Sequence, residues 1–278
     1  MKKFNLMSLA VAGMLTLCVF GCQKKEAATT ADTKQDEISA TVKSQISSLG
    51  FSTENARKVE GGYLVEGDIL LSEANLTEKA ESTHLSVAST EQYRTTNLVK
   101  ALPRVITISV TNLPTVYSNA VNAMITRYNN LGLRFTFQRA AAGTTGQINV
   151  VGFNEGPSGG FITLGSSGFP TASGNPYSEI KMNTNAAAYG ANPNLLYLTS
   201  VLQHEVGHCI GFRHTDYSNR AYSCGGTAVN EGASGVGAIL IPGTPSGPDA
   251  ASFMLACSNG GDRTFNANDI KAINYLYK

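Results

Sequence analysis

The sequence predicts an α+β fold, in which a mixed sheet with a few helices precedes a loop-rich second half. Segments rich in β-branched residues alternate with helical patterns between residues 104 and 211. Residues 223–250 consist mostly of Gly, Pro, Ser and Ala, and their apolar residues have no clear periodicity. The segment from Asn268 to Tyr277 regains helical spacing and predicts a closing helix.

Residues 1–21 have the features of a bacterial lipoprotein signal peptide. Two lysines precede an apolar run that ends at Phe20, and this run is short for a membrane span and lies where a secretory signal belongs. The residues Val-Phe-Gly-Cys that end at Cys22 resemble a lipobox, in which the cysteine becomes the lipidated first residue. An ordinary cleaved signal is the alternative. Residues 22–36 are polar without aromatics and predict a flexible tether.

The expected location is therefore the bacterial cell envelope, with a lipoprotein that faces the periplasm or the cell exterior. The expected contact with the membrane is the lipid anchor on Cys22. A formal net charge of +1 argues against nucleic acid as a partner, because a general basic field is missing. We expect a monomer.

Export places the cysteines where a disulfide can persist. Cys18 leaves with the signal, and Cys22 is expected to carry the lipid. Three cysteines remain, so at most one bridge forms. Cys224 and Cys257 both have Gly- and Ser-rich surroundings, and we expect them to pair. Cys209 lies inside a helical pattern and is expected to be a small buried apolar residue.

The segment ahead of residue 98 predicts a short helix and a strand. Residues 36–49 carry apolar side chains at helical spacing, and residues 63–71 read as a strand that is interrupted at Gly67. Residues 81–97 are polar, and we expect them to be exposed.

The elements between residues 104 and 211 follow from composition and periodicity. RVITISV is rich in β-branched residues, RFTFQR alternates apolar and polar residues, and FITL is a short apolar run flanked by glycines. Pro114 is a residue that often opens a helix. The predicted order is strand 104–110, helix 114–130, strands 134–139, 147–153, 161–164 and 179–183, and helix 194–211.

Three histidines in the segment HEVGHCIGFRH predict a metal site. His204 and His208 are four residues apart, so a helix places them on one face. Gly211 allows a left-handed exit from the helix, which can bring His214 to a third ligand position. Glu205 is near enough to reach a metal-bound water. Three neutral imidazoles and an open fourth position are what one catalytic Zn²⁺ needs.

This segment resembles the metzincin zinc endopeptidases, and the resemblance covers most of residues 104–278. It implies a metzincin-like α+β catalytic domain with a mixed, mostly parallel twisted sheet, an active-site helix and a loop-rich C-terminal half that ends in a helix. It also implies that Met254 forms the Met-turn beneath the zinc. HEVGHCIGFRHTD looks most like the bacterial dual-action HEIGH metallopeptidases, with Val206 where that name has Ile. The runs YSCGG, MLACS and NYLY strengthen the match.

The astacins are a more distant resemblance, and the sequence departs from their pattern twice. Astacins carry Glu directly after the third His, whereas Thr215 and Asp216 follow His214 here. They also place a Tyr two residues beyond the Met-turn Met as an additional zinc ligand, and Ala256 stands there in this sequence. A tyrosine ligand from that turn is therefore not expected.

The resemblance implies a zinc endopeptidase that hydrolyses a polypeptide substrate with a zinc-activated water and Glu205 as general base. An extended substrate would pair with the edge strand within residues 159–168, for which an ordinary loop is the alternative. Two other functions stay open. One is hydrolysis of another amide, such as a cell-wall peptide. The other is a non-catalytic, peptide-binding surface lipoprotein, against which the intact Glu205 argues.

Val65-Glu66-Gly67-Asp68 resembles the astacin pro-segment motif Phe-x-Gly-Asp, with Val in place of Phe. The resemblance implies that Asp68 ligates the zinc until the pro-region, residues 37–94, is cut away from the catalytic domain, residues 95–278. A plain turn between strands is the alternative reading. Residues 22–94 hold more acidic than basic side chains, and residues 95–278 hold more basic than acidic ones. This difference in charge is expected if the first part docks on the second. Chance is the alternative explanation.

Overall fold

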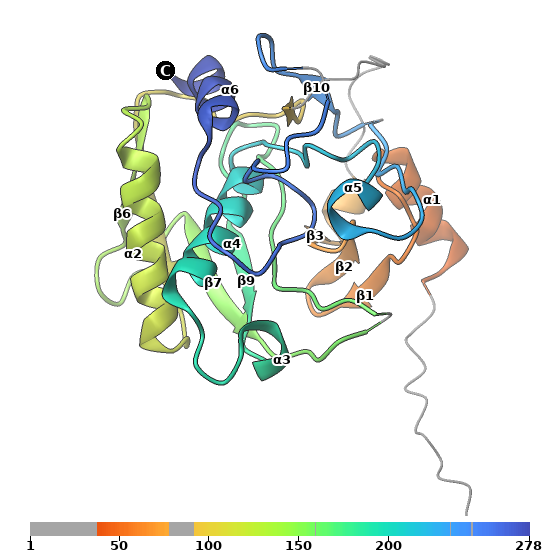
Figure 1. The fold of residues 1–278 in the computed structure, drawn as a ribbon, viewed down its shortest axis with the longest axis horizontal. Helices are drawn as coiled ribbons and strands as arrows, with labels where there is room; N and C mark the ends of the chain where they lie inside the picture. Colours follow the sequence, from red (N-terminus) through yellow and green to blue (C-terminus); the bar gives the residue numbers. More distant parts are fainter. Residues whose placement is uncertain (1–37, 78–91, 159, 234, 246) are drawn as a thin grey trace, which may run out of the picture. The chain divides into compact units, whose positions relative to one another are not determined.

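The described part of the chain combines a mostly parallel sheet with helices, so the predicted α+β class is confirmed (Figure 1). The predicted signal peptide, the tether and Cys22 lie outside the described residues. Among the residues that are described, no helix is both long enough and apolar enough to cross a bilayer. The structure, a computed structural model, describes residues 38–77, 92–158, 160–233, 235–245 and 247–278.

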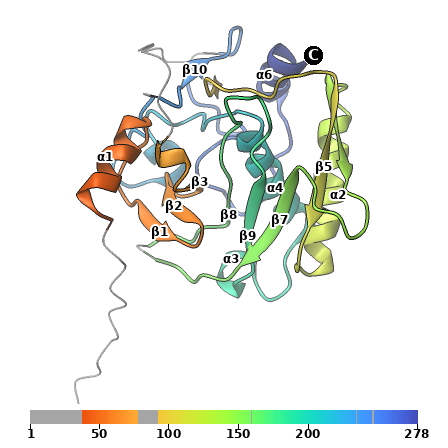
Figure 2. The same ribbon diagram turned by 180° about the vertical axis from the view of Figure 1, so that it is seen from behind.

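The main sheet has five strands, of which four are parallel (Figure 2). The short strand at one edge runs antiparallel to its neighbour. The predicted mixed, mostly parallel sheet is thus confirmed. In spatial order the strands are β6 (Phe135–Arg139), β5 (Arg104–Val110), β7 (Ile148–Phe153), β9 (Glu179–Asn183) and β8 (Gly165–Ser166).

Two helices, α2 (Thr115–Asn129) and α4 (Leu195–Cys209), pack against each other and cover one face of this sheet (Figures 1 and 2). α2 buries one face, whose residues recur three to four positions apart as helical geometry requires. α4 is buried on every side from Leu198 to Cys209, so polar residues on its last turns lie in the interior. Asn194 caps its start by accepting from two backbone N–H groups, and Gly211, with φ +110°, turns the chain away after its end.

The edge of the sheet differs from the prediction. Residues 161–164 are not a strand, and the paired residues are those of β8 immediately after them. The Asn183 side chain donates to the backbone oxygens of Glu155 and Thr163 at 2.8 Å, and its backbone N–H donates to the Leu164 oxygen at 2.9 Å. A side chain thus holds Thr163, and backbone bonding to β9 begins only at Leu164. A short apolar run flanked by glycines does not distinguish these two arrangements.

The predicted exposure of residues 81–97 is wrong for its described part, residues 92–97. Strand β4 (Tyr93–Arg94) pairs with β10 (Ile239–Leu240) in a two-stranded sheet. Gln92 is fully buried, and its amide donates to Asp269 at 2.7 Å. Buried acceptors satisfy the N–H donors of this amide, which allows the polar side chain to lie in the interior, whereas its Oε1 atom has no hydrogen-bond partner.

The N-terminal region, residues 38–77, forms a small unit with a hydrophobic core of its own. Its strands form an antiparallel sheet in the order β1-β2-β3. β2 and β3 are joined by a tight turn at residues 66–68, where Gly67 has φ +87°. The interruption expected at Gly67 is therefore this turn. The elements are α1 (Ala40–Ser48), β1 (Arg57–Val59), β2 (Gly62–Val65), β3 (Ile69–Leu71) and η1 (Asn75–Thr77).

The second half contains little regular structure before its last helix. Its elements after α4 are α5 (Ala221–Cys224), β10 and α6 (Ala267–Tyr277), and α3 (Ala186–Tyr189) precedes α4. Cys224 and Cys257 form a disulfide, which is the pair expected from the sequence, and Cys209 is free and buried.

We expect replacement of Cys224 and Cys257 by serine to lower the free energy of unfolding by about 3–4 kcal/mol, because the bridge closes a loop of 33 residues in the unfolded chain. Urea unfolding of the double variant measures this difference. The parent protein unfolded under reducing conditions is the control and should match the variant. A loss below about 1 kcal/mol would show that the loop gains nothing from closure.

Candidate metal centre

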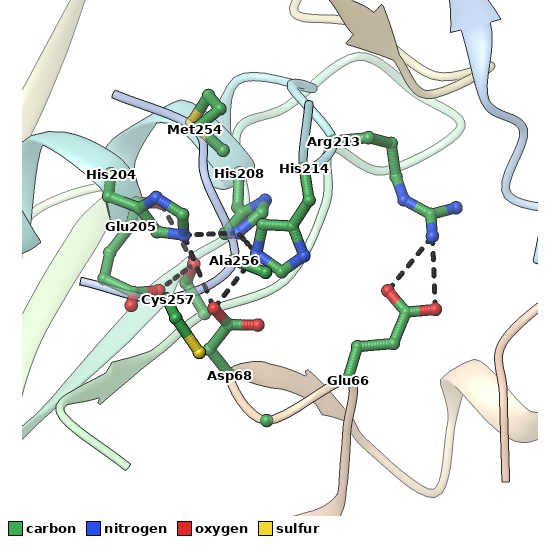
Figure 3. Close-up of polar contacts among 12 residues, drawn as sticks. Glu66, Asp68, His204, Glu205, His208, Arg213, His214, Met254, Ala256 and Cys257 are labelled. Atoms are coloured by element: carbon green, nitrogen blue, oxygen red, sulfur yellow. Dashed lines mark hydrogen bonds and ion pairs between the residues drawn. The ribbon is translucent and has the colours of Figure 1, made fainter. Parts of the chain in front are cut away.

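Three histidine rings meet at the end of α4 (Figure 3). The helix places His204 and His208 one turn apart, and the turn at Gly211 brings His214 back toward them. The Nε2 atom of His208 lies 3.0 Å from that of His204 and 3.2 Å from that of His214. His208 and His214 are almost fully buried, and His204 is 9% exposed. The structure thus brings together the three side chains that the sequence motif identifies.

The other nitrogen of each ring has an acceptor. The Nδ1 atoms of His204 and His208 lie 2.8 Å from the backbone oxygens of Phe253 and Phe212. The Nδ1 atom of His214 lies 2.8 Å from a carboxylate oxygen of Glu231. An acceptor at Nδ1 fixes the proton there, so each Nε2 lone pair is available to a metal ion at the common centre.

Asp68 supplies a fourth ligand atom at this centre. Its Oδ2 atom lies 3.1 Å from His214 Nε2 and 3.4 Å from His204 Nε2. Tetrahedral zinc with bonds of about 2.0–2.1 Å separates its ligand atoms by about 3.3 Å, so the four atoms are spaced as this ion requires. The Oδ1 atom of Asp68 is buried without a hydrogen-bond partner. These residues fit one Zn²⁺ ion.

The electrostatics of the centre favour a negative charge at Asp68. Burial acts to raise the pKa of Asp68, but His214 and His204 outweigh it and hold the pKa well below its ordinary value. Burial acts to lower the pKa of His214, and the carboxylates of Asp68 and Glu231 overcome this and raise it. Burial and the neighbouring rings lower the pKa of His208.

Glu205 follows the first histidine and is also buried, at 2% exposure. Its Oε2 atom accepts a hydrogen bond of 2.8 Å from the hydroxyl of Ser167, just beyond β8. A side chain at Gly165 would place a Cβ atom 2.8 Å from Glu205 Oε1, so only glycine leaves room for this carboxylate. Burial raises the pKa of Glu205, the charge of Asp68 adds to this effect, and Ser167 acts against it.

Met254 packs against α4 close to the ring cluster. A Cβ atom on Gly207 would lie 2.5 Å from the Met254 sulfur, so the small residue inside the HEVGH motif lets this segment approach the helix. In Figure 3, Met254 and Asp68 lie on opposite sides of the three rings. Asp216, two residues after His214, accepts from the backbone N–H of Ala256 at 3.0 Å. Asp216, which stands where this sequence departs from the astacin pattern, thus anchors the segment that carries Met254.

The N-terminal region covers the centre through backbone pairing as well as through Asp68. The N–H of Ser167 donates to the Asp68 oxygen at 2.9 Å, and the N–H of Leu70 donates to the Ser167 oxygen at 2.7 Å. This segment therefore continues the sheet next to β8. A cleft of about 540 Å³ lies beside the turn, and Asp68, Gly165, His204 and Leu255 are among the residues that line it.

Sequence reasoning missed three residues around the centre. Glu231 lies in the aperiodic Gly-rich half, where nothing in the sequence marks it. Arg213 stands next to His214, and its guanidinium pairs with Glu66 at 3.0 Å although both side chains are only 1% exposed. Ser167 lies in the segment that was expected to bind substrate. A buried charged partner is selected by distant contacts, so local spacing carries no signal for it.

We expect Glu231→Gln to weaken Zn²⁺ binding about 10–100-fold, because the neutral amide holds and polarises the His214 ring less well than a carboxylate. Competition with a chromogenic chelator measures the affinity. Glu179→Gln is the matched control, since that side chain is 39% exposed and pairs with Lys181. Equal zinc affinities of the folded Glu231 variant and the parent would contradict this prediction.

This chain is similar to one protein family and to several solved structures. The family model described as dual-action HEIGH metallo-peptidase matches residues 63–277. No curated protein matches. Among solved structures, one of myroilysin is 15% identical, covering 66% of this chain and 86% of that chain with a TM-score of 0.40. High choriolytic enzyme 1, a hatching-enzyme zinc protease of the medaka fish Oryzias latipes, is 15% identical, covering 62% and 88% with a TM-score of 0.36. The chain belongs to the dual-action HEIGH metallopeptidase family.

Proposed function

We propose that this zinc metallopeptidase is an endopeptidase that is exported, tethered to a membrane and held inactive by its own N-terminal region. The observation that carries the proposal is the convergence of three His Nε2 atoms, with Asp68 Oδ2 3.1 Å from the last of them. In this proposal His204, His208 and His214 are the zinc ligands, and Glu205 is the general base.

A zinc ion held by the three histidines would supply Lewis-acid chemistry, which polarises a peptide carbonyl and lowers the pKa of water to about 7. Glu205 accepts the proton of the attacking water and passes it to the leaving amine. Two features support this role. The hydrogen bond from Ser167 holds the carboxylate in one orientation, and burial raises the pKa of the Glu205 carboxyl above its ordinary value.

The peptide substrate would bind as an extended strand beside β8. The N–H and oxygen of Ser167, which pair with Asp68 and Leu70 in this structure, are the groups that a substrate backbone would use. Substrate and N-terminal region therefore compete for the same backbone groups. This competition supports a pro-region within the N-terminal region, and that pro-region must leave before the enzyme acts.

The sequence predicts a pro-region that ends at residue 94, but the contacts of β4 favour a cut ahead of Gln92, and we propose that position instead. β4 pairs with β10, and the backbone N–H of Arg213 donates to the Tyr93 oxygen at 2.9 Å. Gln92 also donates to Ser252 beside the Met254 segment. A cut beyond β4 would remove these contacts from the catalytic domain, whereas a cut ahead of Gln92 keeps them. Mass spectrometry of the N-terminus of the processed protein tests this position, and on the intact precursor it tests lipidation of Cys22.

We expect Glu205→Gln to abolish peptide hydrolysis and to leave one zinc ion bound, because the amide cannot take up a proton while the three His ligands stay in place. Casein cleavage and the zinc content of the same sample measure the two effects. Glu155→Gln, which changes a carboxyl group that is 41% exposed, is the matched control. Casein cleavage by the zinc-loaded Glu205 variant at the parent rate would exclude Glu205 as the base.

We expect Asp68→Ala to raise the activity of the uncut chain about 10–100-fold above its background, because it removes a charged ligand contact of about 1.5–3 kcal/mol. Cleavage of an internally quenched peptide by the uncut chain is the measurement, with the intact mass recorded before and after. Glu73→Ala, at an exposed position of the same region, should leave the background unchanged. An uncut parent chain as active as the cut protein would contradict the inhibition.

A further inference from the structure

The turn that carries Asp68 also carries a second buried carboxylate, and its partner belongs to the catalytic domain. The two oxygens of Glu66 lie 3.1 and 3.0 Å from the Nη2 atom of Arg213. In Figure 3 this pair lies beside the histidine cluster. A carboxylate oxygen of Glu66, a ring nitrogen of His214 and a carboxylate oxygen of Glu231 all lie within 4.8 Å of one another. The Arg213 site is therefore adjacent to the metal centre.

Contacts within the catalytic domain hold the Arg213 guanidinium in place. Nη1 donates to the Gly237 oxygen at 3.1 Å, and Nη2 lies 3.3 Å from the Gly232 oxygen. The rings of Phe169 and Tyr217 lie 5.8 and 5.7 Å from the guanidinium carbon. The ring of Phe51 in the pro-region also lies 5.6 Å from the guanidinium carbon. Removal of the pro-region takes this ring away but leaves the two carbonyl contacts and the other two rings.

The local charges do not balance once Glu66 leaves. Arg213 and Arg220 then share one carboxylate, that of Glu231, which also bonds His214. The Arg213 nitrogen is 3.8 Å from Glu231, which is too long for a hydrogen bond. Departure of Glu66 removes the hydrogen-bonded carboxylate of this guanidinium, so the site favours a new carboxylate at the position of Glu66.

We propose that Arg213 forms a substrate subsite for a carboxylate, which Glu66 fills in the uncut chain. The subsite rests on the proposed endopeptidase function and narrows its substrates. Glu66 is two residues from Asp68, so the recognised carboxylate lies within about two residues of the cleaved bond. Arg220, which donates to the Glu66 backbone oxygen and lines the cleft beside it, supports the same position. The carboxylate comes either from an Asp or Glu side chain or from a free peptide C-terminus.

The test uses the whole chain, which is folded first and then cut at a site-specific protease sequence inserted between residues 77 and 92. Internally quenched peptides in a neutral background carry Glu or Gln at each position within three residues of the cleaved bond. A second set compares a C-terminal acid with the amide. We expect kcat/KM for one carboxylate-bearing position or end to exceed that of its neutral match at least about tenfold. The first set reports side-chain recognition, and the second reports a C-terminus.

Arg213→Lys and Arg220→Gln connect the preference to the site. Both are expected to reduce the ratio of acidic to neutral substrate at least about threefold while cleavage of the neutral peptide continues. Arg220 is partly exposed, at 19%, so its variant remains informative should the Arg213 variant not fold. Arg127→Gln, which removes an ion pair with Asp262, should keep the ratio of the parent.

Binding of the same peptides to the cut, zinc-loaded Glu205→Gln protein separates this inference from the proposed function. Cleavage without any preference for a carboxylate overturns the subsite and leaves the endopeptidase standing. Absence of cleavage by the parent, together with tighter binding of the acidic peptide, overturns the endopeptidase and supports the subsite. Equal binding and no cleavage overturn both. A preference that Arg213→Lys and Arg220→Gln leave unchanged also overturns the subsite.

Discussion

Three imidazole rings share one small volume, and each is held there by an acceptor on the nitrogen that faces away from the others. Those acceptors are the backbone oxygens of Phe253 and Phe212 and the carboxylate of Glu231. None of them lies in α4, the helix that supplies two of the rings, so the orientation of the ligands depends on three other places in the chain. Lone pairs that point at one another across 3.0–3.2 Å repel, and the surrounding structure must therefore fix the rings before a cation is bound. Two of these acceptors, the Phe253 oxygen and the Glu231 carboxylate, come from the aperiodic second half.

In the second half of the chain, hydrogen bonds to buried carboxylates hold the backbone in place, as strand pairing does in the sheet. Asp269 caps α6, and its oxygens also accept from the Ser252 hydroxyl at 3.0 Å and the Phe253 N–H at 3.2 Å, which fixes the carbonyl that holds His204. Burial raises the pKa of Asp269 to about 6. Asp216 ties the chain after the third histidine to the Met254 segment and to Ser223. The disulfide closes the same loop system. A buried carboxylate without hydrogen-bond partners is costly. A few carboxylates that each accept several hydrogen bonds can therefore fix the conformation of a loop.

Elements whose burial repeats locally could be predicted from the sequence, and contacts between distant segments could not. α2 and β6 follow from spacing, because geometry within a few residues decides which face is buried, and β5 follows from its β-branched residues. The histidine cluster follows from the same spacing plus one glycine. By contrast, Glu231 has no periodic context, and Gln92 stands in a segment whose polarity indicates exposure. FITL satisfies the composition of a strand, although the sheet pairs with the residues that follow it. In each of these cases a partner far along the chain decides the outcome.

The ion pair between Glu66 and Arg213 is not explained by stability alone. Both side chains are 1% exposed, and the desolvation of two charges offsets much of their attraction, so an apolar pair of similar volume would serve folding as well. A charged pair differs in what happens when one partner departs: the remaining charge is left in a site built for its opposite. If an apolar pair stood in place of Glu66 and Arg213, departure of one partner would leave an apolar pocket that any hydrophobic side chain could fill. If residues 38–77 act as the proposed pro-region, departure of the Glu66 carboxylate would leave an electropositive site beside the histidine cluster. The chemistry of the pro-region would then determine which substrates the open cleft binds.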